Sequence, residues 1–466
     1  MTNQKNALRP FGIRDKISYS CGDLANDCTF ILSSTFLMKY YTNVMGVPAY
    51  IIGIMMMVAR VVDAFTDVGM GRILDLSKPG KNGKFRPWIL RICGPLAVMS
   101  FLLYPTWFQG MSLSFKVVWM FATYLLWGSV FYTMVNIPYS SMASAITQDP
   151  DERTQLSLFR NAGAMVANLV ITALIPLIVY QVNEAGSQVL VGSTFSVVAG
   201  CFSVAAILFY LICYFGSTER VRIEPAKKEP GARQSNFVMN MLSNKALLAI
   251  IVAAIFLLLA QLTIGSMAQY IFPDYFGNIK AQSVAAMLGS VGILVMAPVC
   301  APLAKRFGKK EISIIGMLVG AAAYLVCFLV RPDNVWVFVA FYVVAYMGLG
   351  VLSNLIWACI IDVIDYGEIK NGVREDGTTY ACYSFARKLG QALSSGLSGA
   401  LITMVGYTAA TAADPTVLSG IFNITCLVPM IGFFLVAATL FFFYPLDRKA
   451  VEANSLQLKE KYSKQG

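Results

Sequence analysis

The sequence predicts an all-α integral membrane protein with twelve spanning helices. Of its 466 residues, 57% are hydrophobic and only 13% are charged, about half the charged fraction of an ordinary soluble domain. Apolar segments of roughly 20 residues recur along the chain, the length that a helix needs to cross a bilayer. The mean hydropathy of +0.64 points the same way.

The expected spans fall into two groups of six. A polar central loop at 216–243 separates an N-terminal six-helix bundle at 1–215 from a C-terminal six-helix bundle at 244–446, and a tail follows at 447–466. The spans are expected at residues 17–42, 48–75, 88–106, 113–141, 157–182, 190–215, 244–272, 282–304, 311–331, 335–364, 377–405 and 418–445.

The net charge of +11 would suggest a nucleic-acid partner in a soluble protein, but in this chain it reflects basic loops on one side of the membrane. The excess Lys and Arg lie in alternate loops, on what the positive-inside rule identifies as the cytoplasmic side. Both termini are therefore expected in the cytoplasm of a bacterium, with the protein in its inner membrane.

Basic loops occupy matching places in the two halves. Residues 71–87 contain Gly71-Arg-Ile-Leu-Asp75 and Gly83-Lys-Phe-Arg-Pro87, and six spans later the chain has Leu303-Ala-Lys-Arg-Phe-Gly-Lys-Lys310. This pattern resembles the major-facilitator carriers, in which two parallel six-helix bundles rock around a site at the bilayer midplane. The alternative is that short cytoplasmic loops are usually basic.

Several kinds of chemistry are excluded by composition. The chain has no His, and its ten Cys residues are scattered without a Cys-x-x-Cys pair, so triad catalysis and clustered metal ligands are not expected. There is no GxxxxGK[ST] phosphate loop for ATP. We expect a transporter and not an enzyme, without a bound cofactor, driven by a gradient of Na⁺ or H⁺.

Three ionisable residues lie inside the second apolar run. Asp63 and Asp67 share one helical face, and Arg60 lies one turn earlier on the same side. An ionised group at the bilayer centre costs about 2.5–3.5 kcal/mol, so all three are expected to face the bundle interior. A Na⁺ ion or a proton would relieve the repulsion between the two carboxylates. The alternative is an Arg–Asp lock without a ligand, and no other metal site is expected.

Polar stripes on the first and fourth spans are candidates for the substrate site. Asp27 lies deeper in the first span than Asp23, which favours Asp27 as the ligand. Tyr132, Asn136 and Ser140 form a stripe on the fourth span, and Thr133 lies on the adjacent face. Hydroxyl and amide groups suit the donors and acceptors of a sugar, although hydrogen bonds between helices are the alternative.

The remaining candidates lie near the fifth, tenth and eleventh spans. Arg160 begins the fifth span and is either a substrate contact or a cytoplasmic anchor. Trp357 could stack on a sugar ring or pack in the core. Ser384 and Lys388 share a face, and the Lys388 cation is expected to need an anion, for which Asp63 and Asp67 are the candidates. Arg387 points about 100° away and is expected to serve either a different partner or an anionic group of the substrate.

A gate of salt bridges is expected at the cytoplasmic end of the tenth span. Asp362 and Asp365 lie there, with Lys370 and Arg374 close by in the sequence. Ion pairs that break and re-form are more plausible at this depth than contact with substrate.

These stretches resemble the glycoside–pentoside–hexuronide:cation symporters, the family of the melibiose and glucuronide carriers. The matching segments are Ala59-Arg-Val-Val-Asp-Ala-Phe-Thr-Asp67, Gly83-Lys-Phe-Arg-Pro-Trp88, Asn136-Ile-Pro-Tyr139, Asp362-Val-Ile-Asp-Tyr-Gly-Glu368 and the stripe from Tyr380 to Lys388. The resemblance implies a cation site of Asp63, Asp67 and Thr133 with Lys388 nearby. It implies sugar contacts from Asp27, Tyr132, Asn136, Arg160 and Ser384.

Three positions depart from the melibiose carriers. Asn136 replaces an Asp, Ser140 replaces a Trp, and Asn26 replaces a Lys. Loss of the Asp removes a negative charge from the expected sugar site, and the glucuronide carriers also have Asn there. The sequence therefore favours an acidic or sulfonated glycoside, or a β-glycoside or pentoside, over an α-galactoside.

The leading expectation is a monomeric carrier in the lipid bilayer that imports a small glycoside together with a coupling cation. A lipid or drug transporter on the same fold is the first alternative, and the polar stripes on the fourth and eleventh spans argue against it. A transporter-like receptor is the second, and the short tail offers it no regulatory domain.

Overall fold

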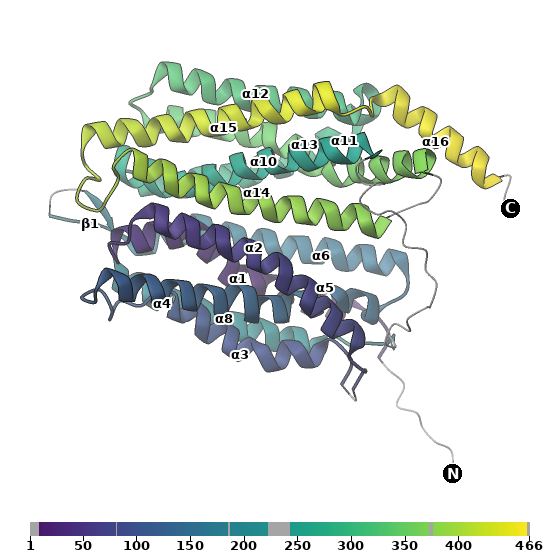
Figure 1. Ribbon diagram of the computed structural model, residues 1–466, viewed down its shortest axis with the longest axis horizontal. Coiled ribbons are helices and arrows are strands. Elements are labelled where there is room, and N and C mark those ends of the chain that lie inside the picture. The colour runs from purple at the N-terminus through teal and green to yellow at the C-terminus, as the bar shows by residue number, and fades with distance from the viewer. Residues whose placement is uncertain (1–8, 81, 185–186, 222–242, 372–375, 464–466) are drawn as a thin grey trace, which may run out of the picture. The chain divides into compact units, whose positions relative to one another are not determined.

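The computed structural model describes residues 9–80, 82–184, 187–221, 243–371 and 376–463, which form long helices (Figure 1). The chain divides into two compact units, Met1–Glu229 and Pro230–Gly466. Most of the predicted central loop, residues 222–242, lies outside the described residues.

The described part of unit 1 forms six helical stretches, two of which contain a π-helical segment. A short hairpin, in which Tyr180 pairs with Leu190, joins the fifth stretch to the sixth. The elements are α1 (Ile13–Asn43), α2 (Ala49–Leu76), α3 (Arg86–Leu102), α4 (Leu113–Leu125) continued by η1 (Leu126–Tyr132) and α5 (Thr133–Ile146), α6 (Pro150–Leu169) continued by η2 (Val170–Leu174) and α7 (Ile175–Val179), β1 (Tyr180–Val182), β2 (Gln188–Leu190) and α8 (Gly192–Gly216).

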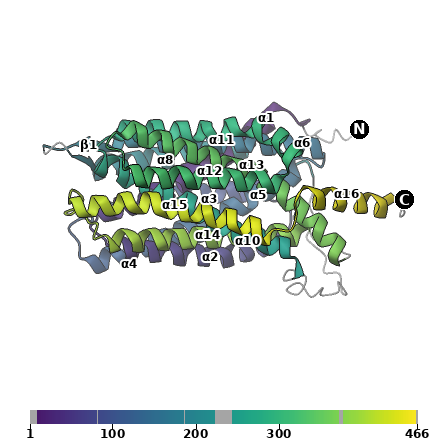
Figure 2. The same cartoon turned by 90° about the horizontal axis from the view of Figure 1, so that it is seen from above.

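The described part of unit 2 forms six further long stretches and a C-terminal helix that extends beyond them (Figure 2). Asp414 caps one of these helices by accepting hydrogen bonds from the Thr416 hydroxyl and the Thr416 N–H, and these bonds lower the pKa of Asp414. The elements are α10 (Lys245–Tyr270) continued by η3 (Ile271–Tyr275), α11 (Ile279–Phe307), α12 (Lys309–Val330), α13 (Val335–Asn371), α14 (Asp376–Met404), α15 (Pro415–Phe443) and α16 (Arg448–Ser463).

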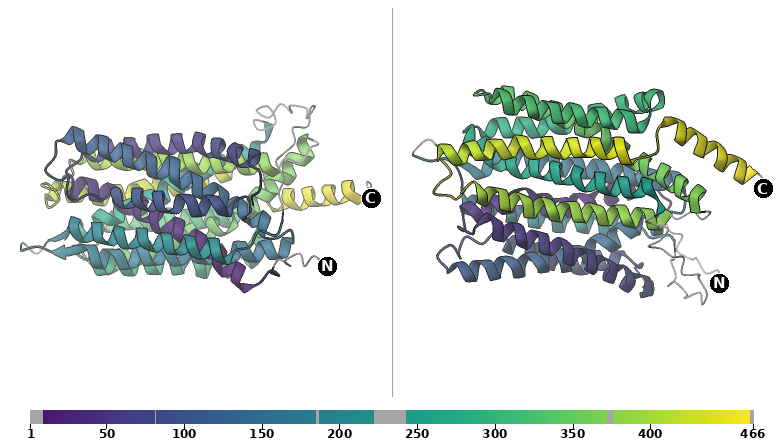
Figure 3. Two further views of the ribbon diagram at one scale, coloured as in Figure 1. Left: turned by 90° about the horizontal axis from the view of Figure 1, so that it is seen from below. Right: turned by 45° about the horizontal axis from the view of Figure 1, so that its top comes forward.

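Corresponding helix pairs pack together in the two units. In unit 1, α1 packs against α6 and α8, α3 packs against α5 and α8, and α2 packs against α5. In unit 2, α10 packs against α14 and α15, α12 packs against α13 and α15, and α11 packs against α13. Counted in order within each unit, these are the same pairs, and Figure 3 shows the helices from two further sides. Each unit is therefore one copy of a six-helix repeat.

Eight of the twelve stretches are long and apolar enough to cross a membrane, with mean hydropathies from 1.4 to 2.8. Of the other four, α3 has only 17 residues, while α1, α2 and α14 carry candidate charged residues. Large apolar side chains also lie on the outside, among them Phe441, Phe442 and Phe443, which are 62%, 73% and 69% exposed. A surface of this kind needs a lipid environment, so the chain is a multi-pass membrane protein.

The predicted spans agree with the observed helices except at a few ends. α6 begins at Pro150 and not near residue 157, and α13 continues to Asn371 and not to residue 364. The sequence pattern does not predict η1, η2 or η3, because one extra residue in a helical turn leaves the apolar content of the span unchanged.

A buried carboxylate ties the start of α1 to the segment that follows α8. Asp15 is fully buried and forms ion pairs with Arg9 and Arg220 at 2.7 and 2.8 Å. The backbone N–H of Thr218 also donates to it, at 3.2 Å. The beginning of the chain and the beginning of the central loop are thus fixed to one another.

A second carboxylate caps α3. Glu219 accepts hydrogen bonds from the backbone N–H groups of Lys84, Phe85 and Arg86 at 2.7–3.0 Å. These N–H groups at a helix start have no partner within the helix, and a negative charge there is favourable. Gly83 precedes them with a φ of 99°, and a Cβ at Gly83 would lie 2.5 Å from the Glu219 carboxyl carbon.

We expect Gly83→Ala to destabilise unit 1 by about 2–4 kcal/mol, since the new side chain adopts a strained backbone and displaces the Glu219 cap. The melting temperature in detergent should fall by about 5–10 °C. Gly80→Ala is the control, because a Cβ there meets only the Gly83 carbonyl oxygen at 3.7 Å. Equal melting temperatures for the two variants would contradict the role of the cap.

Candidate functional site

The charged residues of α2 form a buried pair inside unit 1. Arg60 and Asp63 are 9% and 7% exposed, and the Arg60 guanidinium donates to Asp63 Oδ2 at 3.1 Å. The other side of the guanidinium lies 4.8 Å from the centre of the Phe30 ring on α1. Arg60 is thus held by a carboxylate and an aromatic face, as a buried cation requires.

Two hydroxyl groups on the fourth helical stretch meet the two carboxylates of α2. Thr133 Oγ1 donates to Asp67 Oδ1 at 3.0 Å, and Ser129 Oγ donates to Asp63 Oδ1 at 2.5 Å. The structure therefore brings together Asp63, Asp67 and Thr133, the three residues predicted for the cation. Sequence reasoning missed Ser129, although its spacing of four residues from Thr133 was a usable signal.

The residues of α1 and α6 that were predicted to bind the sugar lie close together. Arg160 forms its ion pair with Asp23, the carboxylate nearer to the start of α1. Arg160 donates to Asp23 Oδ1 at 3.0 Å, and its guanidinium lies 5.4 Å from the centre of the Tyr139 ring. Asp27 lies one turn deeper and is half-buried. Among the described residues, its carboxylate has neither a hydrogen bond nor an ion pair.

A short hydrogen-bond chain leads to Asn136. The Tyr210 hydroxyl donates to Asn26 Oδ1 at 2.6 Å, and Asn26 Nδ2 donates to Asn136 Oδ1 at 3.5 Å. Two of the three departures from the melibiose carriers therefore contact each other. These two hydrogen bonds orient the Asn136 amide. Because its Oδ1 accepts from Asn26, its NH₂ group is the part without a described partner.

Tyr132 forms part of an aromatic group in unit 1. Its ring stacks on Phe30 with centroids 5.6 Å apart and lies 5.8 Å from the Trp127 ring. Since Phe30 also supports Arg60, Tyr132 links the predicted sugar residues to the charged residues of α2.

In unit 2, the predicted substrate residues lie on α13 and α14. Trp357 is 48% exposed, and its ring lies 5.3 Å from Tyr383 and 6.2 Å from Tyr380. On α14, Ser384 is exposed and Lys388, one turn further, is half-buried. Trp357 is therefore a partly accessible aromatic surface and not a core residue.

At the expected ion-pair gate, Asp362 pairs with a residue other than the two that lie close to it in the sequence. Asp362 pairs with Lys309 at 2.7 Å, whereas the Lys370 ammonium donates to the Ser243 carbonyl oxygen. Sequence distance had suggested Lys370 and Arg374, but the first turn of α12 is closer in space. Arg374 lies outside the described residues, Asp365 is half-buried and Arg387 is exposed.

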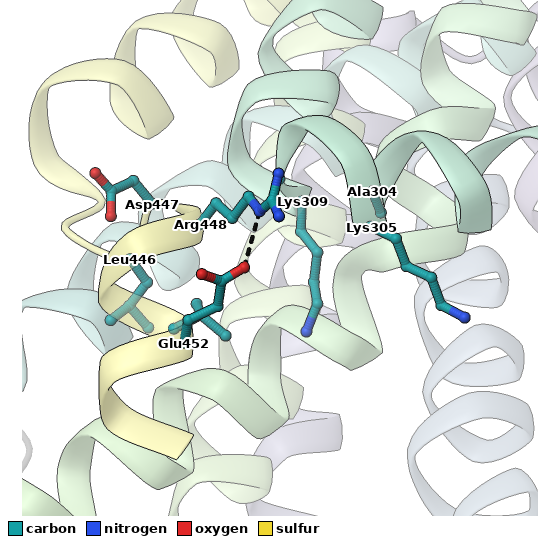
Figure 4. A pocket seen from close by; sticks show the side chains of 9 residues that line it. Ala304, Lys305, Lys309, Leu446, Asp447, Arg448 and Glu452 are labelled. Atoms are coloured by element: carbon teal, nitrogen blue, oxygen red, sulfur yellow. Dashed lines mark hydrogen bonds and ion pairs between the residues drawn. The ribbon is translucent and has the colours of Figure 1, made fainter. Parts of the chain in front are cut away.

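A separate cavity of about 240 Å³ lies beside α16 in unit 2. Figure 4 shows the side chains around it, including the ion pair of Arg448 with Glu452 at 2.8 Å. Arg448 also donates to the Arg306 carbonyl oxygen at 2.6 Å, which anchors α16 to the end of α11. None of the predicted substrate residues lines this cavity, so it is not the candidate transport site.

Two copies of a six-helix repeat with buried charges in their spans are typical of a membrane carrier. The chain belongs to the MFS/sugar transport protein family, whose model matches residues 18–448, and it is a transporter and not an enzyme. It is 34% identical over 437 residues to the "Uncharacterized symporter YjmB" of Bacillus subtilis (strain 168), covering 93% of this chain and 92% of the relative. It is 32% identical over 440 residues to the "Glucuronide carrier protein homolog" of Escherichia coli (strain K12), covering 94% and 93%.

The fold is also found among solved structures. A bacterial homologue of the human lysosomal transporter Spinster, in an inward-facing and unoccupied conformation, matches with a TM-score of 0.68 and 12% identity. The match covers 95% of this chain and 97% of that one. The predicted fold class, the major-facilitator fold, is thereby confirmed.

Proposed function

We propose that this protein is a secondary active transporter that couples uptake of a glycoside to a cation, Na⁺ or H⁺, by alternating access. The observation that carries the proposal is the pair of carboxylates on α2, each of which accepts a hydrogen bond from a hydroxyl of the facing helical stretch. Carboxylate and hydroxyl oxygens are the ligands that hard cations prefer. The ion pair of Arg60 with Asp63 lies within α2 and does not by itself account for the hydroxyl groups that Ser129 and Thr133 direct at the two carboxylates.

The sugar side of the proposal rests on three residues of unit 1. Asp27 is a carboxylate without a described partner, and a charged acceptor of this kind binds sugar hydroxyls strongly. The amide of Asn136 is oriented through Asn26 and offers its NH₂ group as a donor. Arg160 is a cation whose side chain is 34% exposed although it already pairs with Asp23.

An acidic glycoside is the substrate class that we favour, on the basis of Arg160 and not of Asn136. Asn26 and Asn136 are in contact, so the Lys and the Asp that melibiose carriers have at these positions would neutralise each other. Replacing both leaves the net charge unchanged, so Asn136 alone does not favour an acidic sugar over a neutral one. Arg160 remains able to pair with the carboxylate of a glucuronide, and a relative named as a glucuronide carrier homologue is consistent with this class.

We place the carrier in a bacterial inner membrane with both termini in the cytoplasm. The basic residues that support this orientation include Arg9 and Arg220, which converge on Asp15 at one end of unit 1. Basic segments next to spans remain on the cytoplasmic side.

The test is uptake into membrane vesicles of a glucuronide, a sulfonated sugar, a xyloside and an α-galactoside, each with an imposed Na⁺ gradient and, separately, with an imposed pH gradient. We expect accumulation of the glucuronide or the sulfonated sugar with one of the two gradients, at least about tenfold above the level without a gradient, which corresponds to about 1.4 kcal/mol. Accumulation of a neutral glycoside alone would refute the acidic class but keep symport. Accumulation of a lipid or drug instead of every sugar would refute the proposal.

A further inference from the structure

Ser129 makes a contact that belongs to none of the sequence motifs. It lies in η1 and is 2% exposed. Its hydroxyl is 2.5 Å from Asp63 Oδ1 and 3.4 Å from the Ala59 carbonyl oxygen. A hydroxyl has one hydrogen, so the short contact to the carboxylate is the hydrogen bond.

The contact is one of two equivalent hydrogen bonds between the fourth helical stretch and α2. Ser129 and Thr133 are one turn apart on the fourth stretch, and Asp63 and Asp67 are one turn apart on α2. Each hydroxyl donates its only hydrogen to a carboxylate oxygen and keeps its lone pairs. Each can therefore donate to its carboxylate and bind a cation at the same time.

Of the two carboxylate oxygens of Asp63, Oδ1 is the one that faces η1. Arg60 occupies Oδ2, while Gly128 lies against Oδ1, where a Cβ would be 4.0 Å away. The backbone at Gly128 thus places no side chain against Oδ1, and the next residue, Ser129, directs a hydroxyl at it. A cation on this side would be separated from the Arg60 charge by the carboxylate itself.

The π-helical segment gives a local reason for this placement. A π turn bonds residue i to i+5 in place of i+4, so it changes which side chains face a neighbouring helix, and such turns often occur at functional sites. η1 ends at Tyr132, directly before Thr133. Ser129 lies within the widened segment and Thr133 directly follows it, so the two hydroxyl residues flank the end of η1.

We propose that Ser129 Oγ is a ligand of the coupling cation and that this cation is Na⁺. With Asp63, Asp67 and Thr133 it makes a site of four oxygen-bearing side chains. Several oxygen ligands serve a metal ion, whereas binding a proton needs only one carboxylate oxygen. This inference rests on the proposed function and specifies the ion.

The test measures Na⁺ binding directly on the purified full-length protein by calorimetry and by the shift of the melting temperature with NaCl, with KCl as the reference salt. Ser129→Ala should weaken Na⁺ binding by about 10-fold to 100-fold, the effect of removing one hydrogen-bonding group from a charged site. Ser129→Thr keeps the hydroxyl and should bind Na⁺ within about threefold of the wild type. Ser144→Ala is the control, because within the described part of the chain the Ser144 hydroxyl bonds only to the Ser141 carbonyl oxygen of its own helix.

Wild-type Na⁺ affinity in folded Ser129→Ala protein would overturn the inference and leave symport intact. If Ser129→Ala does not fold, Ser129→Cys decides, since a thiol fills similar space but is a weak donor and ligand for a hard cation. A wild type that accumulates sugar with a pH gradient and shows no Na⁺ binding also overturns the inference while keeping cation coupling. Absence of accumulation with either gradient refutes the proposed function itself.

Discussion

Asp63→Asn is expected to abolish the stimulation of sugar binding by the coupling cation. The carboxylate of Asp63 is buried, and its two oxygens accept hydrogen bonds from Arg60 and Ser129. Asn preserves the size of the side chain but removes the negative charge that balances Arg60 and attracts the cation. The apparent cation affinity should fall at least about 100-fold, which corresponds to about 2.7 kcal/mol.

The measurement is the dissociation constant of the sugar at increasing concentrations of the coupling cation. Linkage requires that the cation tighten sugar binding by the same factor as the sugar tightens cation binding. In Asp63→Asn protein both factors should be close to one. Stimulation as strong as in the wild type would rule out Asp63 as a cation ligand.

A double variant separates this loss from simple misfolding. Asp63→Asn alone leaves Arg60 as an uncompensated buried charge, at a cost of about 3–5 kcal/mol. Arg60→Gln combined with Asp63→Asn removes both charges, so much of the stability should return while the cation response stays absent. Glu452→Gln is the control for loss of a carboxylate, since its ion pair with Arg448 is exposed and should contribute little.

The sequence was most informative where the fold requires a rare residue. An ionised side chain inside an apolar span must find a partner, so the sequence alone predicted interior positions for Arg60, Asp63 and Asp67; the first two are buried and Asp67 is half-buried. The apolar content of the spans likewise located the helices, because crossing a bilayer fixes both their length and their composition. Features whose absence or misplacement would cost much free energy in the bilayer can therefore be predicted from the sequence.

Several contacts between side chains of different helices could not be predicted from the sequence. Ser129 is an ordinary small polar residue in an apolar span, and its spacing from Thr133 indicates a shared face but not the contact with Asp63. The contact of Asn26 with Asn136 joins two helices, and no local pattern predicts it. The same holds for Lys309, which pairs with Asp362 although Lys370 is closer in sequence.

Asn136 is an example in which a contact between helices decides the charge of the expected sugar site. Read as a single position, Asn136 looked like the loss of one negative charge. Placed beside Asn26, it became half of a neutral replacement for a Lys and an Asp. Whether the charges at two positions cancel depends on their contact in the folded structure. Arg160 is then the residue that is expected to discriminate between acidic and neutral sugars.

Asp27→Asn is expected to remove high-affinity sugar binding while leaving the cation site intact. Among the described residues, Asp27 has no hydrogen bond or ion pair, so the change leaves no buried charge without its partner. A carboxylate that accepts hydrogen bonds from two sugar hydroxyls gains about 1.5–3 kcal/mol from each. Sugar affinity should therefore fall about 100-fold or more, measured by titration of the purified protein, with the cation-induced shift of the melting temperature unchanged.

Asp23→Asn, one turn away, is the matched comparison. Asp23 is 8% exposed and pairs with the half-buried Arg160, so its loss should lower the melting temperature in the absence of any ligand, as expected when a partly buried ion pair is broken. Asp27→Asn should leave that temperature within about 2 °C of the wild type, because less than about 1 kcal/mol of stability is at stake. Equal destabilisation by both variants would mean that Asp27 also supports Arg160. Unchanged sugar affinity in Asp27→Asn protein would show instead that the substrate binds without this carboxylate.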